Sequence, residues 1–61
     1  MHEYNVSGFA MPVLEAIAGY EEAEEFRALP GMCDVNVRVP EERVDEFTER
    51  CDTLGVHCKL I

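Results

Sequence analysis

Apolar and polar residues recur with helical spacing in two long stretches of this chain and alternate in three short ones. The clearest helical stretch runs from residue 39 to residue 55. Its apolar residues lie three or four positions apart and form one stripe: Val44, Phe47, Cys51 and Leu54. Pro40 suits the first helical position, because the N–H that proline lacks would be unpaired there anyway. Gly55 suits the end, since glycine readily adopts the left-handed conformation that closes many helices.

Alternation predicts three strands, over residues 3–10, 32–39 and 56–61. In the second strand, one side carries Cys33, Val35, Val37 and Val39, and the other carries Met32, Asp34, Asn36 and Arg38. In the third, Val56, Cys58 and Leu60 alternate with His57, Lys59 and Ile61. In the first, Tyr4 and Val6 share the apolar side, and Gly8 marks either a bulge or the end of the strand.

Residues 12–29 also follow a helical pattern, but their apolar stripe drifts around the helix. The first part of the stripe contains Val13, Leu14, Ile17 and Tyr20. Beyond it, a straight helix would place Glu24 in the middle of the apolar face. Gly19 is the position at which the helix can bend or break, because glycine has a low helix propensity. We therefore expect either one kinked helix or two short helices that meet near Gly19.

The predicted order of elements is β-α-β-α-β. Elements of this size bury their apolar faces only against each other, which predicts an α+β two-layer sandwich. We expect one compact domain over residues 1–61, with a three-stranded sheet and two helices on one face. A sharp break at Gly19 would reverse the chain and make the sheet mixed or antiparallel.

The chain of 61 residues has 13 acidic and 5 basic side chains, for a formal net charge of −8. This charge argues against direct binding to nucleic acid or to an anionic membrane, whose phosphates would repel it. It favours either a basic protein partner or no charged partner. No segment has the pattern of a signal peptide or the length of an apolar membrane span, so we expect a cytoplasmic protein.

Residue types that carry catalysis or bind metals are scattered. The three cysteines form no Cys-x-x-Cys pair, which favours reduced thiols, and all fall on predicted core faces. His57 and Cys58 are adjacent, so in a strand they point to opposite faces. Ser7 and Thr48 lie in no nucleophile motif, and the glycines form no phosphate-binding loop. We expect no enzyme activity, no metal and no cofactor.

Carboxylates are the one chemical group that the predicted helices concentrate. Residues 12–29 and residues 40–54 each have a net charge of −4, which together is the whole net charge of the chain. These carboxylates can serve solubility alone, or they can be held on rigid helices to meet a basic surface. On the second interpretation the partner-binding residues are Glu21, Glu22, Glu24, Glu25, Glu42, Asp45, Glu46, Glu49 and Asp52. Arg27, Arg43 and Arg50 then only reduce self-repulsion.

The short length, the charge of −8 and the segments EEAEEF at 21–26 and PEERVDEFTERCD at 40–52 resemble the small phage-encoded anti-CRISPR proteins. Some of those are DNA mimics, whose acidic surfaces block the DNA-binding face of a CRISPR surveillance complex. The resemblance implies a viral, non-catalytic inhibitor in the bacterial cytoplasm. Its partner would be a basic, nucleic-acid-binding subunit of a CRISPR-Cas complex.

A second hypothesis uses the sheet. The helix start VPEERVDEF also resembles helices of small ferredoxin-like regulatory domains. With both helices on one face, the other face carries Met32, Asp34, Asn36, Arg38, His57, Lys59 and Ile61, and two such faces can pair. This regulatory or oligomerising domain requires a dimer, whereas the inhibitor does not. We expect the inhibitor, acting as a monomer.

Overall fold

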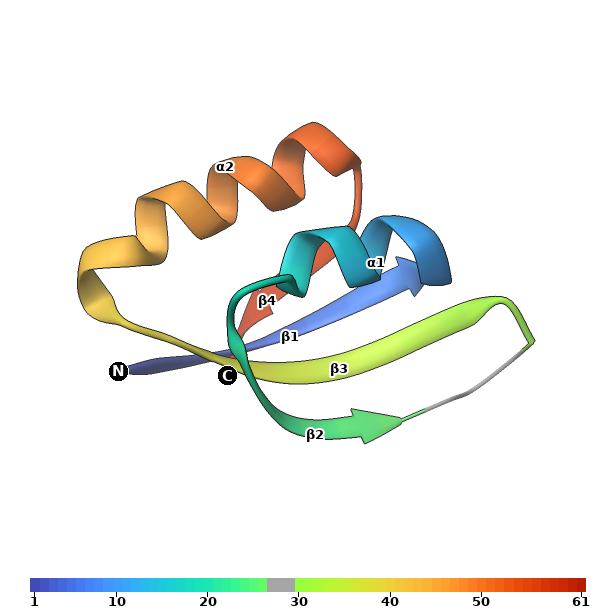
Figure 1. The fold of residues 1–61 in the computed structure, drawn as a ribbon, viewed down its shortest axis with the longest axis horizontal. Coiled ribbons are helices and arrows are strands. Elements are labelled where there is room, and N and C mark those ends of the chain that lie inside the picture. The colour runs from blue at the N-terminus through green and yellow to red at the C-terminus, as the bar shows by residue number, and fades with distance from the viewer. Residues whose placement is uncertain (27–29) are drawn as a thin grey trace.

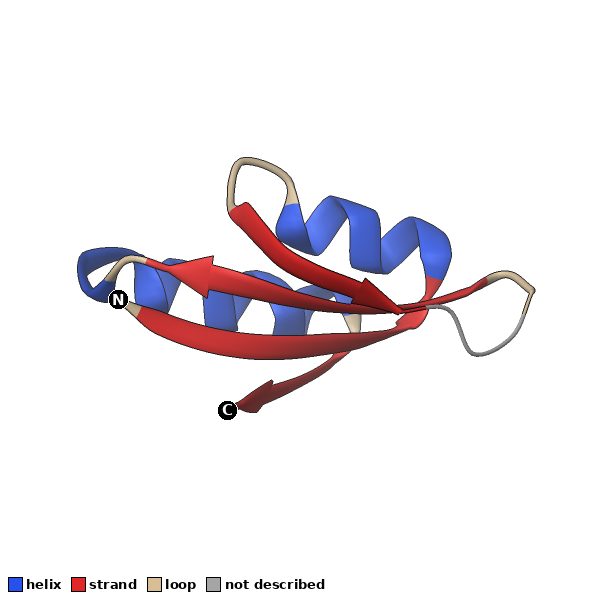
Figure 2. Ribbon diagram, turned by 90° about the horizontal axis from the view of Figure 1, so that it is seen from below, coloured by secondary structure: helices blue, strands red, loops and turns tan. Residues whose placement is uncertain are grey.

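The computed structural model describes the backbone of residues 1–26 and 30–61 and the side chains of residues 1–22 and 30–61. In chain order the elements are β1 (His2–Phe9), α1 (Ala10–Ile17), β2 (Glu21–Phe26), β3 (Met32–Val39), the short 3₁₀ helix η1 (Glu41–Arg43), α2 (Val44–Leu54) and β4 (His57–Leu60). They form one layer of strands and one layer of helices (Figure 1). Both helices lie on the same face of the sheet (Figure 2). Neither helix of the described residues is long and apolar enough to cross a membrane.

The four strands form one antiparallel sheet in the order β2-β3-β1-β4. The central strands β1 and β3 pair along their whole length, from His2 opposite Val39 to Phe9 opposite Met32. Helix α1 joins β1 to β2 with β3 between them, and α2 joins β3 to β4 with β1 between them. This interleaving of two β-α-β units is the ferredoxin-like arrangement. The predicted α+β sandwich is therefore confirmed, but with four strands instead of three.

The hydrophobic core lies between the helices and the sheet. Phe47 of α2 is fully buried and packs against the rings of Tyr4 and Tyr20, with centroid distances of 5.4 and 5.0 Å. The apolar side predicted for β3 is buried: Cys33, Val35, Val37 and Val39. The stripe predicted for the second helix also faces the core, with Phe47 and Cys51 buried and Val44 and Leu54 partly buried against it.

The structure corrects the prediction for residues 12–29. The helix ends at Ile17, and a turn at Gly19, with φ of 87°, leads the chain into the edge strand β2. The residues of EEAEEF are good helix formers on average, but pairing with β3 and the burial of Tyr20 against Phe47 outweigh that local preference. Neither the kinked helix nor the pair of short helices is found, but the chain does reverse at Gly19, and the sheet is antiparallel, which is one of the two arrangements that a sharp break there would allow. Residues 27–29 lie outside the described part of the chain.

The remaining strand boundaries differ in detail. β1 pairs with β3 without a register shift through Gly8 and ends at Phe9, so Gly8 precedes a strand end and is not a bulge. The register shift of the sheet lies instead in β2, between Glu22 and Glu24. Leu60 is 57% exposed although the alternation predicted it to be buried, because β4 is an edge strand.

Candidate binding groove between the helices

The first acidic run lies on a strand, not on the helix face that the sequence predicted. Glu21 and Glu22 are exposed at the start of β2, and Glu21 accepts a hydrogen bond from Arg38 of β3 at 3.0 Å. Glu24 and Glu25 follow on the same strand, where their backbones lie opposite β3. The side chains of these last two residues lie outside the described part of the chain.

The second acidic run lies on a helix, as predicted. Glu42 belongs to η1, and the other members belong to α2; all five are exposed: Glu42, Asp45, Glu46, Glu49 and Asp52. Helix α2 packs against α1 and β4, whereas β2 forms the opposite edge of the sheet from β4 (Figure 1). The two acidic runs therefore do not share one helical surface.

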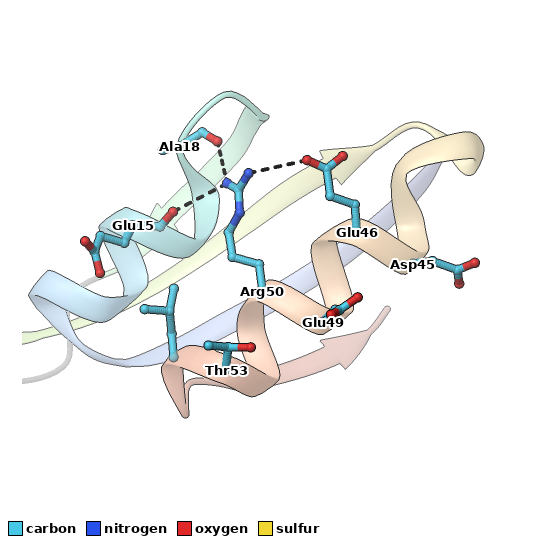
Figure 3. Close-up of a pocket in the computed structure, with 8 residues that line it drawn as sticks. Glu15, Ala18, Asp45, Glu46, Glu49, Arg50 and Thr53 are labelled. Carbon is cyan, nitrogen blue, oxygen red and sulfur yellow. Dashed lines mark hydrogen bonds and ion pairs between the residues drawn. The ribbon is translucent and has the colours of Figure 1, made fainter.

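A groove runs between α1 and α2 (Figure 3). Three predicted partner-binding residues line it, Asp45, Glu46 and Glu49, and Glu15 of α1 joins them. The other lining residues are Ala18, Arg50, Thr53 and Leu54. Glu15 was not among the predicted site residues, because the sequence does not indicate which side of α1 turns toward α2. The groove thus gathers carboxylates from both helices.

Arg50 is the only basic residue among the described residues that line the groove, and its side chain is already engaged. Its Nη1 donates hydrogen bonds to the carbonyl oxygens of Ala18 at 2.8 Å and Ala16 at 3.3 Å. Its Nη2 lies 3.6 Å from Oε1 of Glu46 (Figure 3). Because the last carbonyls of a helix have no partner within it, Arg50 supplies one for α1. The prediction that this arginine only reduces self-repulsion is wrong, since Arg50 joins the two helices.

Arg43, directly before the first residue of α2, also makes a structural contact. Its guanidinium lies 4.4 Å from the ring centroid of Tyr20, and its Nε donates a hydrogen bond to Glu46 at 3.2 Å. The hydrogen bond to Glu46 raises the pKa of Arg43. Glu46 is therefore shared by Arg43 and Arg50, and its charge is balanced within the protein.

The other three groove carboxylates have no such partner. Glu15, Asp45 and Glu49 form no ion pair within residues 1–22 and 30–61. Asp45 and Glu49 are four residues apart on α2, a spacing at which like charges cost a helix a few tenths of a kcal/mol. Among the described side chains, the groove therefore presents three negative charges that no ion pair compensates.

Apolar surface borders these charges. Met11 and Leu14 of α1 and Ala18 directly after it recur three and four residues apart, and Met11 and Leu14 are 75% and 50% exposed. Leu54 of α2 contributes a further apolar side chain to the groove itself. An apolar strip beside a row of carboxylates is complementary to a segment that carries both apolar and basic side chains.

The described residues contain no group of three or more histidine, cysteine or acidic side chains arranged to hold a metal ion. His57 is exposed, while Cys58 packs against the core, as their adjacent positions on a strand predicted. The hydroxyl of Thr48 donates to the carbonyl oxygen of Val44 at 3.0 Å, so it serves the helix backbone. His57, Cys58 and Thr48 therefore do not form a nucleophile with a base beside it.

The open face of the sheet, on which the second hypothesis depends, is polar. Asn5 of β1 donates hydrogen bonds to Asp34 and, at 3.0 Å, to Asn36 of β3. Arg38 lies 4.0 Å from Glu3 and 3.0 Å from Glu21. These side chains already pair with one another across the strands, whereas Phe9, on the same side of β1 as Asn5, is 72% exposed and leaves apolar surface near one end of the face.

Comparisons of the chain with protein-family models, with curated proteins and with solved structures gave no match. The fold and the groove therefore define the class of the protein by themselves. It is a small α+β domain of ferredoxin-like arrangement, with a groove between its helices whose carboxylates include three that pair with no described side chain.

Proposed function

We propose that the chain is a non-catalytic binding protein whose acidic groove occupies a basic, nucleic-acid-binding surface of another protein, as a DNA mimic. One observation carries the proposal: Glu15, Asp45 and Glu49 gather at the groove with no ion-pair partner among the described side chains. A surface that holds phosphates would supply the missing cations. Such charge complementarity speeds association and fixes orientation.

The spacing of the carboxylates on α2 supports this function. Asp45, Glu49 and Asp52 lie on successive turns of the helix, and one turn rises about 5.4 Å. That interval falls between the rise of about 3.4 Å for one nucleotide of a strand and twice that rise. The row therefore places one carboxylate at each turn along a line, as a strand places its phosphates along a line, although the two intervals differ.

The resemblance to anti-CRISPR proteins extends the proposal to a target. The partner is a basic DNA-binding subunit of a bacterial CRISPR-Cas surveillance complex, and the chain acts on it as a monomer in the bacterial cytoplasm. The polar, internally paired sheet face supports the monomer. Glu42 and Asp52 flank the groove residues on η1 and α2 and extend the contact, whereas Glu21 and Glu22 of the other acidic run lie on β2, outside the groove lining.

Two double variants with the same change in net charge test the groove. The groove variant is Asp45→Lys with Glu49→Lys, and the control is Glu22→Lys with Glu41→Lys, at exposed positions outside the groove lining. Purified surveillance complexes are bound to labelled target DNA, and each folded protein is titrated in. We expect the wild type and the control to displace DNA with similar potency. The groove variant should bind the complex at least about tenfold more weakly, which is a loss of about 1.4 kcal/mol in binding free energy.

The possible outcomes separate the explanations. If both variants lose potency equally in displacing DNA, the net charge of the chain causes the displacement and no defined site is involved. If the wild-type chain displaces no DNA from any complex tested, the DNA-mimic function is rejected. Circular dichroism of each variant shows that the comparison is made between folded proteins.

The regulatory or oligomerising domain is the second candidate, favoured by the ferredoxin-like arrangement and by the exposure of Leu60 and Ile61 at the end of β4. It requires a dimer. Light scattering at micromolar concentration distinguishes it, because a dimer that Ile61→Ser dissociates supports this candidate, and a monomer rejects it.

A further inference from the structure

Two thiols meet beneath the last turn of α2. Cys51 belongs to the buried stripe of the helix and is 1% exposed, whereas Cys58 of β4 is partly exposed. Both are free, and both line a hollow beside α2 that is distinct from the groove. Burial raises the pKa of both thiols, and the contact between them raises the pKa of Cys51 further while it offsets part of the increase at Cys58.

The end of α2 brings these two residues together. Gly55 adopts the left-handed conformation, and the N–H groups of Gly55 and Val56 donate to the carbonyl oxygens of Asp52 and Cys51, each at 3.2 Å. This closure folds the chain back under the helix. Val56 and Cys58 then share one side of the chain as it enters β4, so Cys58 returns toward Cys51.

We propose that Cys51 and Cys58 form a modification site for peroxides, at which they close to an intramolecular disulfide. The Cys58 thiol gives its proton to solvent, and the thiolate attacks one oxygen of hydrogen peroxide. The O–O bond breaks, Cys58 becomes a sulfenic acid, and the departing hydroxide takes up a proton to form water. Cys51 then attacks the sulfenic sulfur, the S–S bond forms, and the hydroxyl group leaves with the Cys51 proton as a second water. Two thiols and one hydrogen peroxide give one disulfide and two waters.

The environments of the two thiols assign their roles. Burial raises the pKa of Cys51 to about 12, so this thiol stays protonated and does not begin the reaction. Burial also raises the pKa of Cys58, but the contact with Cys51 opposes that increase. Cys58 is therefore the attacking thiol, and Cys51 completes the bond. The reaction should accelerate as pH rises toward the pKa of Cys58, because the thiolate is the reactive form.

Cys33 provides an internal control. It is buried on β3, and β1 lies between β3 and β4. Two strand spacings separate the backbones of β3 and β4 by about 9–10 Å, whereas the Cα atoms of a disulfide are usually about 4.4–6.8 Å apart. Cys33 thus carries the same thiol group but lies too far from Cys58 to form a disulfide with it.

The test treats the whole reduced chain with hydrogen peroxide in small molar excess and then alkylates the remaining thiols. We expect the intact mass to fall by two hydrogen atoms before alkylation, peptide mapping to link Cys51 to Cys58, and Cys33 to be alkylated. The Cys33→Ser variant should give the same product, and a dithiol reductant should restore both thiols. This result does not depend on whether the groove binds a partner.

Three results would overturn the proposal. One is Cys58 found as sulfinic or sulfonic acid with Cys51 still free, which would show that Cys51 does not reach the sulfenic sulfur. Another is a disulfide between two chains as the main product. The third is consumption of Cys33 as rapidly as Cys58, which would show that the hollow confers no selectivity.

Discussion

Arg50 connects the two helices through a single side chain. It donates to carbonyl oxygens at the end of α1 and pairs with Glu46 on its own helix, and it remains 31% exposed. We expect Arg50→Met to lower the free energy of unfolding by about 1.5 kcal/mol, because a hydrogen bond from a charged group contributes about that much. Urea unfolding followed by circular dichroism measures the change.

Arg38→Met is the matched control, since Arg38 also pairs with carboxylates but is 44% exposed and bonds to no helix end among the described residues. Exposed ion pairs of this kind contribute about 0.5 kcal/mol. If both substitutions cost the same, Arg50 does not cap α1 in solution, and the width of the groove is set by other contacts.

Tyr20 shows how a residue can be predicted correctly for the wrong reason. Its apolar spacing placed it in the core, and the structure buries it against Phe47 with Arg43 and Arg50 over its ring. The pattern assumed a continuing helix, whereas Tyr20 lies just after the turn at Gly19. Apolar spacing thus identified what is buried, but not the backbone that buries it.

Among the elements, those whose local and tertiary requirements agree were predicted well. β3 and α2 combine a regular apolar pattern with suitable end residues: β3 has the predicted bounds and α2 ends where predicted, whereas the predicted first turn of the helix is the 3₁₀ helix η1. β2 could not be predicted in this way, because a run of glutamates has no strand pattern and becomes a strand only by pairing with β3. The strand count was wrong for the same reason.

The end of α2 gives a prediction for a single element. Gly55 has φ of 71°, and a Cβ added there would meet no atom within 4 Å, so only the backbone conformation opposes a side chain. We expect Gly55→Ala to cost about 1–2 kcal/mol, which for a chain of this size lowers the unfolding temperature by roughly 4–16 °C. Gly55→Asn should cost less although asparagine is larger, because asparagine tolerates the left-handed conformation. Equal melting temperatures for the two variants would contradict this explanation.

At the scale of the whole molecule, the candidate groove was only partly predictable. The sequence places Asp45, Glu46 and Glu49 on one helix, but Glu15 joins them only because α1 packs beside α2. Likewise, the contact of Cys51 with Cys58 depends on how β4 returns beneath α2. Spacing along a chain predicts faces of elements, whereas a site between elements depends on their packing.

The net charge of −8 should make stability depend on salt. The Cα radius of gyration is 10.3 Å. In 0.01 M salt the Debye length is about 30 Å, so charges on opposite sides of the molecule repel one another. In 0.15 M salt it is about 8 Å, so most of that repulsion is screened. We expect this increase in sodium chloride to raise the free energy of unfolding by roughly 1 kcal/mol, as several like-charge pairs of a few tenths each are relieved. Urea unfolding at both concentrations measures it.

The groove variant with Asp45→Lys and Glu49→Lys is the comparison for this effect. Each reversal changes the net charge by two units, from −8 to −4 in the double variant. Its stability should respond less to salt than that of the wild type. An equal response would mean that the salt acts on the unfolded chain or through hydration, not on repulsion within the fold.

The interleaved strand order has a consequence for how the chain folds. Each β-α-β half lacks its own middle strand: β3 fills the gap of the first half, and β1 fills that of the second. Pairs such as His2 with Val39 and Tyr4 with Leu60 join opposite parts of the sequence, so the contact order is high for so short a chain. Neither half can complete a sheet before the other is present. Folding is therefore expected to be all-or-none and slower than that of a helical bundle of equal length, and a ribosome must release most of the chain before any of its sheet is stable.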